Sequence, residues 1–264
     1  MSARRTGAPG GTGAPRRSRR PRRIVLGSVG ALLAVAVLGF LTWSSFVMGP
    51  DAEALARVDA NAAVAVERTD TAIVLTPTEQ AGTGLDGVGL VFVPGAKVDA
   101  ASYEATLAPL VEEGASVVIT RPILNLAFFD LRSLASFTAQ ADGVDEWLVG
   151  GHSLGGVKAC QWGEDPEVAG LVLFGSYCAN DLSASGLPVL SVSGSEDGLS
   201  TPEKVAAASD QLPADARFVE IDGANHADFG WYGPQPGDGT PTISHEEADA
   251  RIAGALLAFA GDRG

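Results

Sequence analysis

Residues 147–156, Trp-Leu-Val-Gly-Gly-His-Ser-Leu-Gly-Gly, join a short apolar run to a glycine-rich turn that holds Ser153. A helix-compatible stretch, Leu154–Trp162, follows directly. The pattern G-x-S-x-G between a strand and a helix is typical of a nucleophile elbow. In such a turn, glycines relieve crowding around a strained serine, and the helix N-terminus faces developing negative charge. The turn therefore predicts that Ser153 is a nucleophile; the alternative is an ordinary serine in a glycine-rich turn.

Apolar runs alternate with helix-compatible stretches through most of the chain. Continuous apolar runs indicate strands that are covered on both faces, as in a parallel sheet. The expected strands of this kind are residues 88–93, 117–120, 147–149, 168–174, 187–192 and 217–221. Two shorter strands, 64–68 and 72–75, are expected to form an opening hairpin. The repeated order of strand, helix and strand predicts a doubly wound, mostly parallel α/β sheet of about eight strands.

A serine hydroxyl is a poor nucleophile unless a base takes its proton, and the chain has only three histidines. His152 is the neighbour of Ser153, where its side chain is expected to point away. His245 begins the last expected helix and is expected in solvent. His226 lies in a loop after the strand at 217–221, at the sheet edge where ligands bind in such folds. His226 is therefore the expected general base, and a buried structural histidine is the alternative.

A carboxylate should orient the imidazole and stand between the serine and the histidine in chain order. Asp197 follows the strand at 187–192 and fits that place. Asp181 and Glu196 are its rivals. For each of the three, the alternative is a solvated loop acid.

The tetrahedral intermediate needs two backbone N–H donors for its negative charge. Leu154, the residue after the nucleophile, is expected to supply one. The loop Pro94-Gly-Ala-Lys97 follows the strand at 88–93, and Ala96 is the expected second donor. Proline has no N–H, and Gly95 lets the backbone approach closely, although it could also be a plain turn glycine.

These motifs resemble those of the α/β-hydrolase superfamily, specifically the small bacterial α/β-hydrolase fold-5 type, which is related to dienelactone hydrolases and carboxylesterases. Besides the elbow, residues 92–99, 125–130, 194–198 and 225–239 carry the resemblance, which covers about residues 64–262. It implies the α/β-hydrolase fold and a triad in the order Ser153, Asp197, His226. It names no substrate.

The connection after the strand at 168–174 is short. Caps in this superfamily usually lie there, yet only residues 175–186 precede the next strand. We expect no cap domain and an open site, with small or extended acyl substrates and little activation by lipid micelles. The loop 230–241 could form a pocket rim or cover the sheet edge. Phe128 and Phe129 pose the same choice, and packing in the core is favoured for them.

Charge is distributed unevenly along the chain, with a basic tail at the N-terminus and an acidic body after it. Residues 1–23 carry eight arginines and no acid, residues 24–50 carry no charge, and the rest holds ten lysines and arginines against 32 acids. Residues 24–43 are long enough to cross about 30 Å of hydrocarbon at roughly 1.5 Å per residue. The arginines then act as positive-inside residues and place the body outside the cytoplasm. Because topology accounts for them, nucleic-acid binding is not expected.

The predicted organisation is a basic cytoplasmic tail (1–23), a transmembrane anchor (24–43), a linker (44–63) and a hydrolase domain (64–264). Residues 52–54, Ala-Glu-Ala, would pass as a cleavage site, so a secreted protein is the alternative to a cell-membrane protein. The apolar stretch exceeds the roughly 7–15 residues of usual signals, which favours the anchor. Cys160 and Cys178 would then lie in an oxidising compartment, either as a disulfide or as two buried thiols.

The combined expectation is a serine hydrolase, most simply a carboxylic ester hydrolase that forms an acyl-enzyme from a small-molecule ester. This chemistry requires neither a metal nor a cofactor. Two alternatives stay open. One is an acyltransferase that uses the same triad, and the other is a non-catalytic binding protein on a hydrolase fold.

Overall fold

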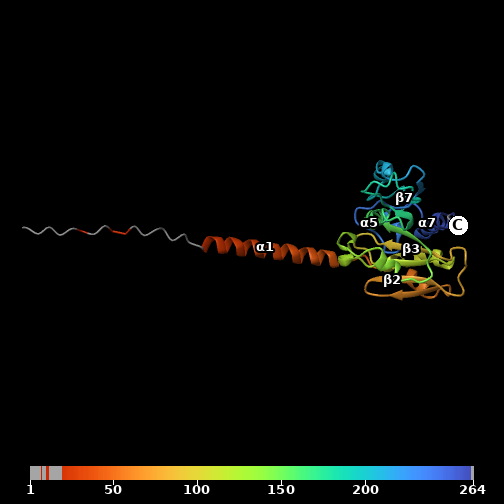
Figure 1. Cartoon of the computed structure of the whole chain (residues 1–264), viewed down its shortest axis with the longest axis horizontal. Coiled ribbons are helices and arrows are strands. Elements are labelled where there is room, and N and C mark those ends of the chain that lie inside the picture. Colours follow the sequence, from red (N-terminus) through yellow and green to blue (C-terminus); the bar gives the residue numbers. More distant parts are fainter. Residues whose placement is uncertain (1–6, 8–9, 12–19, 263–264) are drawn as a thin grey trace, which may run out of the picture. The chain divides into compact units, whose positions relative to one another are not determined.

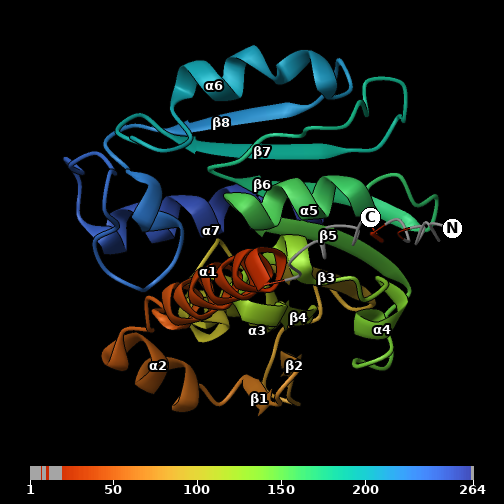
Figure 2. The same ribbon diagram turned by 90° about the vertical axis from the view of Figure 1, so that its left-hand side faces the viewer.

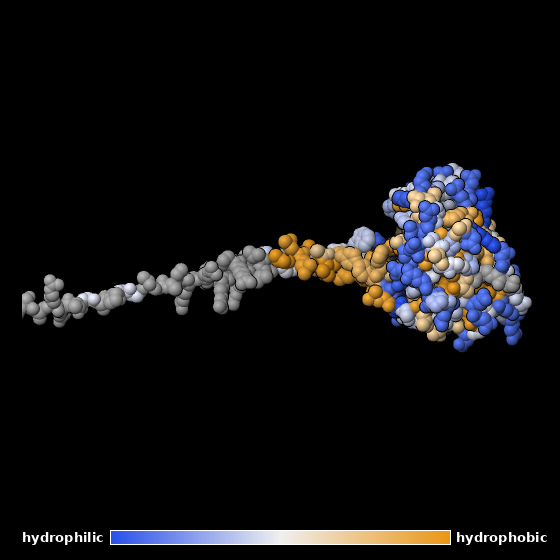
Figure 3. Space-filling view, turned by 45° about the horizontal axis from the view of Figure 1, so that its top comes forward, coloured by the Kyte–Doolittle hydropathy of each residue, from blue (hydrophilic) through white to orange (hydrophobic). Residues whose placement is uncertain are grey.

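The computed structural model describes residues 7, 10–11 and 20–262. The chain divides into two compact units, Met1–Trp43 and Ser44–Gly264. Most of the expected basic tail, residues 1–23, lies outside the described residues. Helix α1 (Arg20–Ser45) contains an apolar window, Ser28–Ser45, of mean hydropathy 1.7, and Figure 3 shows its described part in hydrophobic colours. By length and composition this helix could cross a membrane, and a signal sequence would meet the same criterion.

The described residues from 44 onward are built around an eight-stranded sheet of order β1-β2-β4-β3-β5-β6-β7-β8 (Figure 1). In chain order the strands are β1 (Val64–Arg68), β2 (Ala72–Pro77), β3 (Val88–Val93), β4 (Ser116–Thr120), β5 (Glu146–His152), β6 (Val168–Phe174), β7 (Val189–Gly194) and β8 (Arg217–Ile221). The pairs β1–β2 and β2–β4 are antiparallel, and the other neighbours are parallel. The predicted hairpin and mostly parallel sheet are thus confirmed.

Helices cover both faces of the sheet (Figure 2). The helices of the body are α2 (Ala52–Asp59), α3 (Glu104–Glu112), α4 (Ala135–Thr138), α5 (Leu154–Trp162), α6 (Pro202–Ala207) and α7 (His245–Gly261). Helices α2, α3 and α7 contribute to one buried apolar cluster, and α4 and α5 contribute to the other. Successive strand residues face opposite layers, so Phe92 of β3 belongs to the first cluster and Val91 to the second. This double burial explains why the central parallel strands consist mainly of consecutive apolar residues.

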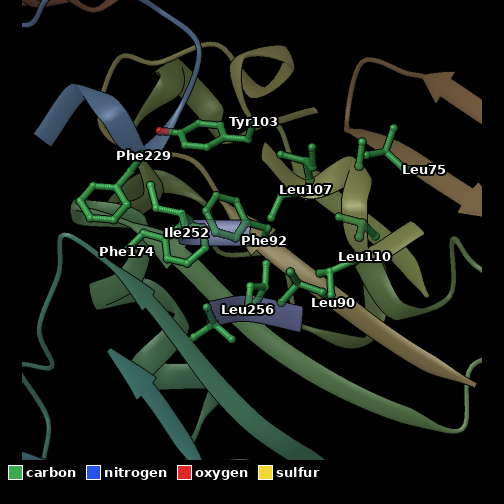
Figure 4. Close-up of a cluster of buried hydrophobic side chains, with 14 of the residues drawn as sticks. Leu75, Leu90, Phe92, Tyr103, Leu107, Leu110, Phe174, Phe229, Ile252 and Leu256 are labelled. Carbon is green, nitrogen blue, oxygen red and sulfur yellow. The ribbon is translucent and has the colours of Figure 1, made fainter. Parts of the chain in front are cut away.

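Aromatic rings fill the first cluster beside the carboxyl ends of the strands (Figure 4). The ring of Phe92 lies 5.1 Å from that of Tyr103 and 5.5 Å from that of Phe174, between centroids. Phe174 in turn stacks on Phe229 at 5.7 Å. Fully buried rings of this size contribute roughly 1.5–3 kcal/mol each by removal from water. The cluster gives the loops that follow β3, β6 and β8 a common rigid support.

Three features of the structure test what the sequence predicted for the linker, the cysteines and the cap domain. Within the expected linker, residues 52–59 form α2, which buries Ala54 and Val58, and Val58 belongs to the first cluster. A disulfide joins Cys160 of α5 to Cys178, which decides between the two states left open. Residues 175–188, between β6 and β7, contain neither helix nor strand, which confirms that no cap domain lies there.

Candidate active site

The turn from β5 to α5 holds Ser153 in a strained conformation, with φ 52° and ψ −123°. A non-glycine residue at positive φ costs roughly 1–3 kcal/mol and persists only where its surroundings hold it. The flanking glycines make this possible. A Cβ at Gly155 would lie 2.0 Å from the carbonyl oxygen of Val93, and one at Gly151 would lie 2.4 Å from the carbonyl carbon of Gly155. The glycines therefore allow the close approach that the elbow pattern predicted.

The segment after β6 fixes the backbone of Ser153. The Ser153 N–H donates to the carbonyl of Phe174 at 3.0 Å, and the Ser176 hydroxyl donates to the carbonyl of Ser153 at 2.7 Å. Ser153 itself is partly exposed at the carboxyl end of the sheet. Its side chain can therefore be reached from solvent.

Asp197 and His226 form a buried pair. Nδ1 of His226 lies 2.7 Å from Oδ2 of Asp197, and both side chains are completely buried. The other carboxylate oxygen accepts the N–H groups of Leu199 and Ser200 at 2.8 and 2.7 Å. An ionised carboxylate only accepts hydrogen bonds, so Nδ1 carries the proton and Nε2 presents a lone pair. His226 is thereby oriented as a proton acceptor at Nε2.

The rival acids lie elsewhere. Asp181 is exposed and accepts the N–H of Ser183 at 2.9 Å. Glu196 is also exposed, and its carboxylate faces the hydroxyl of Ser195 at 3.5 Å. Of the three candidate acids, Asp197 is the one that contacts His226.

Gly175 connects the serine to the buried pair. Its neighbours Phe174 and Ser176 hold the backbone of Ser153, as described above. A Cβ on Gly175 would lie 3.0 Å from Oδ2 of Asp197 and 3.1 Å from Nδ1 of His226. The segment 174–176 therefore contacts both the backbone of Ser153 and the Asp197–His226 pair. Within residues 20–262, Nε2 of His226 has no hydrogen-bond partner, and such contacts often tighten only when substrate binds.

His152 does not point away from this site, contrary to the sequence expectation. It is completely buried, and its ring lies 4.3 Å from that of His226 between centroids. Nδ1 of His152 is 2.8 Å from the Tyr103 hydroxyl, which also accepts the N–H of Gly95 at 2.9 Å. Burial raises the pKa of Tyr103, so the phenol stays protonated and donates to His152. Burial and the neighbouring His226 lower the pKa of His152 well below its ordinary value, so its imidazole is neutral.

His245 is not fully in solvent either. Its Nδ1 lies 2.9 Å from Oδ1 of Asp228, and its ring meets Trp231 edge-on at 4.1 Å. The residue packs the start of α7 against the loop that follows His226. Within residues 20–262 it makes no hydrogen bond to the Asp197–His226 pair.

Two backbone N–H groups beside Ser153 are available to a ligand. The N–H groups of Leu154 and Ala96 have no hydrogen-bond partner within the described part of the chain. The Gly95 N–H is already bonded to Tyr103, which leaves Ala96 as the donor in this loop. Both expected donors thus remain free, and the reason that Gly95 is unavailable became visible only in the structure.

The sequence from 89 to 250 matches the model of the alpha/beta hydrolase family, which spans more than half of the chain. The chain belongs to the alpha/beta hydrolase family. No curated protein matches it in sequence.

Solved structures with the same fold are distant in sequence from this alpha/beta hydrolase. The esterase domain of a Rhodothermus marinus protein has 18% identity and a TM-score of 0.53, over 75% of this chain and 97% of that one. DcsB in complex with its substrate analogue has 15% identity and a TM-score of 0.50, over 76% and 99% of the two chains. Est1E from Butyrivibrio proteoclasticus has 13% identity and a TM-score of 0.48, over 75% and 99%.

The loop after His226 in this alpha/beta hydrolase contains an acid that sequence reasoning missed. Oδ1 of Asp238 accepts the N–H groups of His226 and Gly198, each at 3.1 Å, and Oδ2 accepts that of Ala227 at 2.8 Å. One carboxylate therefore joins the loop that carries Asp197 to the loop that carries His226. The available signal was an acid between two glycines in the family-like stretch 225–239.

A cavity of about 240 Å³ opens beside the elbow of this alpha/beta hydrolase. Its lining comes from α5 and from the segment before α4: Ala127, Phe128, Asp130, Leu131, Leu154, Val157, Lys158 and Gln161. The expectation that Phe128 and Phe129 pack in the core is wrong, because their exposures are 67% and 47%. Phe128 instead lines this cavity, whose lining also includes Leu154, the residue after Ser153.

Proposed function

We propose that the chain is a serine hydrolase of carboxylic esters, with Ser153, His226 and Asp197 as its catalytic triad. The observation that carries the proposal is the buried 2.7 Å contact between His226 and Asp197, packed against Gly175, whose two neighbours hold the backbone of the strained Ser153. Membership of the alpha/beta hydrolase family supports hydrolytic chemistry, and the triad assignment is our own inference from these contacts.

The reaction begins with proton transfer from the Ser153 hydroxyl to Nε2 of His226, while the oxygen attacks the ester carbonyl. The N–H groups of Leu154 and Ala96 hold the oxyanion of the tetrahedral intermediate. His226 returns the proton to the leaving alcohol, which departs and leaves an acyl group on Ser153. Water then attacks the acyl-enzyme with His226 as base, and the carboxylic acid leaves. Asp197 holds the imidazole in its tautomer and stabilises the imidazolium.

Labelling with a fluorophosphonate probe tests the nucleophile. The native chain should be labelled and Ser153→Ala should not, whereas the exposed control Ser183→Ala should label normally. His226→Gln and Asp197→Asn should reduce kcat on p-nitrophenyl acetate by roughly 10⁴-fold, while Asp181→Asn and Glu196→Gln should not. Labelling that survives in Ser153→Ala would refute the assignment. Product analysis with added alcohols separates hydrolysis from acyl transfer.

We also propose that residues 24–43 anchor the protein in the cell membrane with its body outside the cytoplasm. Three observations support this: an apolar helix long enough to span, the arginine-rich tail before it, and the disulfide between Cys160 and Cys178. Disulfides persist in oxidising compartments outside the cytoplasm. The protein should resist alkaline extraction from membranes and be digested by protease added outside. An N-terminus beginning near residue 54 on the mature protein would show instead that the helix is a cleaved signal.

A further inference from the structure

Exposed apolar side chains gather in one part of the body. Among residues 44–262, the large apolar side chains that are exposed include one on β8, Phe218, and one near the start of the body, Phe46. All the others belong to residues 123–131: Ile123 at 54%, Phe128 at 67%, Phe129 at 47% and Leu131 at 90% exposure. We call these four residues the apolar rim. Such a concentration on an otherwise charged body indicates a contact surface.

The apolar rim borders the candidate active site. Phe128 and Leu131 line the 240 Å³ cavity from one side, and Leu154 and Val157 of α5 line it from the other. Leu154 follows Ser153 directly, so the cavity begins one residue from the candidate nucleophile. The apolar side chains of this lining suit a hydrocarbon chain.

The first residues after the apolar helix dock in the same region. Met48 pairs with the loop after β3, donating its N–H to the carbonyl of Lys97 at 2.8 Å and accepting that of Asp99 at 2.9 Å. The Lys97 N–H donates to the carbonyl of Asn125, next to the rim, at 2.8 Å. Residues 44–48 can span at most about 18 Å, at ~3.6 Å per residue. An anchor at residues 24–43 would therefore limit, by this chain length alone, how far the loop that carries Ala96 can lie from the bilayer.

Basic side chains accompany the rim in a body that is acidic overall. Lys97 and Arg121 belong to the two loops just described, and Lys158 lines the cavity together with Asp130. Cations beside an exposed apolar surface favour contact with a membrane that contains anionic lipid.

We propose that the apolar rim inserts into the surface of the bilayer, and that the substrate is a membrane-resident ester with an extended acyl chain. The acyl chain reaches Ser153 through the cavity, the alcohol leaves with the proton from His226, and water releases the fatty acid. In this proposal the anchor holds the site at the lipid surface, so activity on a membrane-resident ester does not depend on the opening of a lid. The substrate assignment rests on the proposed hydrolase function, whereas the membrane contact can be tested without activity.

Fluorescence quenching tests the membrane contact. The full chain is reconstituted in vesicles of three parts phosphatidylcholine and one part phosphatidylglycerol, with and without spin-labelled lipid. Leu131→Trp adds an indole to the rim, and Phe218→Trp adds one on β8 as the matched control. The lipid label should quench the added emission of Leu131→Trp and leave that of Phe218→Trp unchanged. Equal quenching of the two variants would overturn the proposal.

Activity on two esters tests the substrate class. The ratio of kcat/KM for p-nitrophenyl palmitate in these vesicles to that for soluble p-nitrophenyl acetate is measured for each variant. Loss of two inserted side chains in Ile123→Ser/Phe129→Ser should lower this ratio at least about tenfold. Phe218→Ser should keep the native ratio. An unchanged ratio in the double variant overturns the substrate assignment; a native chain inactive on both esters refutes the hydrolase function itself, and the quenching still decides the membrane contact.

Discussion

The imidazole rings of His152 and His226 lie 4.3 Å apart, centroid to centroid, and both side chains are completely buried. Two charged imidazoles at this distance would repel each other strongly in a dry environment. The lowered pKa of His152 keeps it neutral, so His226 can accept a proton in the proposed reaction without an adjacent cation. The hydroxyl of Tyr103 holds His152 in this state from the other side.

Replacing His152 with asparagine should make stability less dependent on pH. A histidine whose folded pKa lies below its unfolded value of about 6.5 stabilises the fold above that value, and the contribution is lost as pH falls through the folded pKa. The stability penalty of His152→Asn, about 1–3 kcal/mol at pH 8, should therefore shrink at pH 5. Urea unfolding at the two pH values measures it. Ser102→Ala is the control, because it is a buried substitution that removes no ionisable group. It should lower the free energy of unfolding by the same amount at both pH values.

Removing the Asp238 carboxylate should lower the rate of the chemical step. Asp238→Ala leaves the N–H groups of His226 and Gly198 without their acceptor, so both loops can shift. Small displacements of a catalytic group cost up to about 10²-fold, and we expect kcat to fall roughly 10- to 100-fold with a smaller change in KM. Asp238→Asn keeps one acceptor oxygen and should recover part of the loss. The exposed Asp262→Ala is the control, and native kcat in Asp238→Ala would contradict the positioning role.

A methyl group at Gly175 should damage the site more than the fold. Gly175 has φ +47°, and an added Cβ would press on Asp197 and His226 at 3.0 and 3.1 Å. Gly186 has φ +68° but has no atom within 4 Å of an added Cβ. Both alanine variants should lose roughly 1–2 kcal/mol for the left-handed backbone. Gly175→Ala should in addition lose most esterase activity, and comparable activity in the two variants would argue against a tight fit around the pair.

Loss of Arg68 should destabilise the body in a pH-dependent way. Burial raises the pKa of Glu104, and Arg68 opposes this through an ion pair with its carboxylate. Without Arg68 the folded pKa rises further, so protonated Glu104 stabilises the fold at low pH and the benefit disappears as pH rises through that pKa. Arg68→Ala should cost roughly 2 kcal/mol at pH 8 and less at pH 5, by urea unfolding. Arg217→Ala, which breaks an exposed pair with Asp262, should cost under about 1 kcal/mol at either pH.

Breaking the disulfide should lower stability without removing activity at moderate temperature. Cys160 and Cys178 are 18 residues apart, and closing such a loop restricts the unfolded chain by about 3 kcal/mol. In the double variant Cys160→Ser/Cys178→Ser, the free energy of unfolding should fall by about 3 kcal/mol, so the urea midpoint should be lower. Reductant should shift the native midpoint toward that of the variant and leave the variant unaffected. No shift on reduction would contradict a stabilising role.

Local patterns in the sequence determined the sheet and the candidate catalytic residues. Continuous apolar runs marked the buried strands, because a strand covered on both faces has no solvent side. Glycines around Ser153 indicated a turn too crowded for a Cβ, and the structure places Gly155 within 2.0 Å of a neighbouring carbonyl. Chain order and strand ends were enough to select His226 and Asp197 as candidates.

Tertiary structure alone decided which distant groups meet. The contact of His152 with Tyr103, the Cys160–Cys178 bond and the exposure of Phe128 have no local signature. Hydropathy reports the environment that a side chain favours on average, whereas partner choice depends on distances between residues far apart in the chain. Those distances are set by the order of the strands in the sheet, which the sequence specifies only through folding of the whole body.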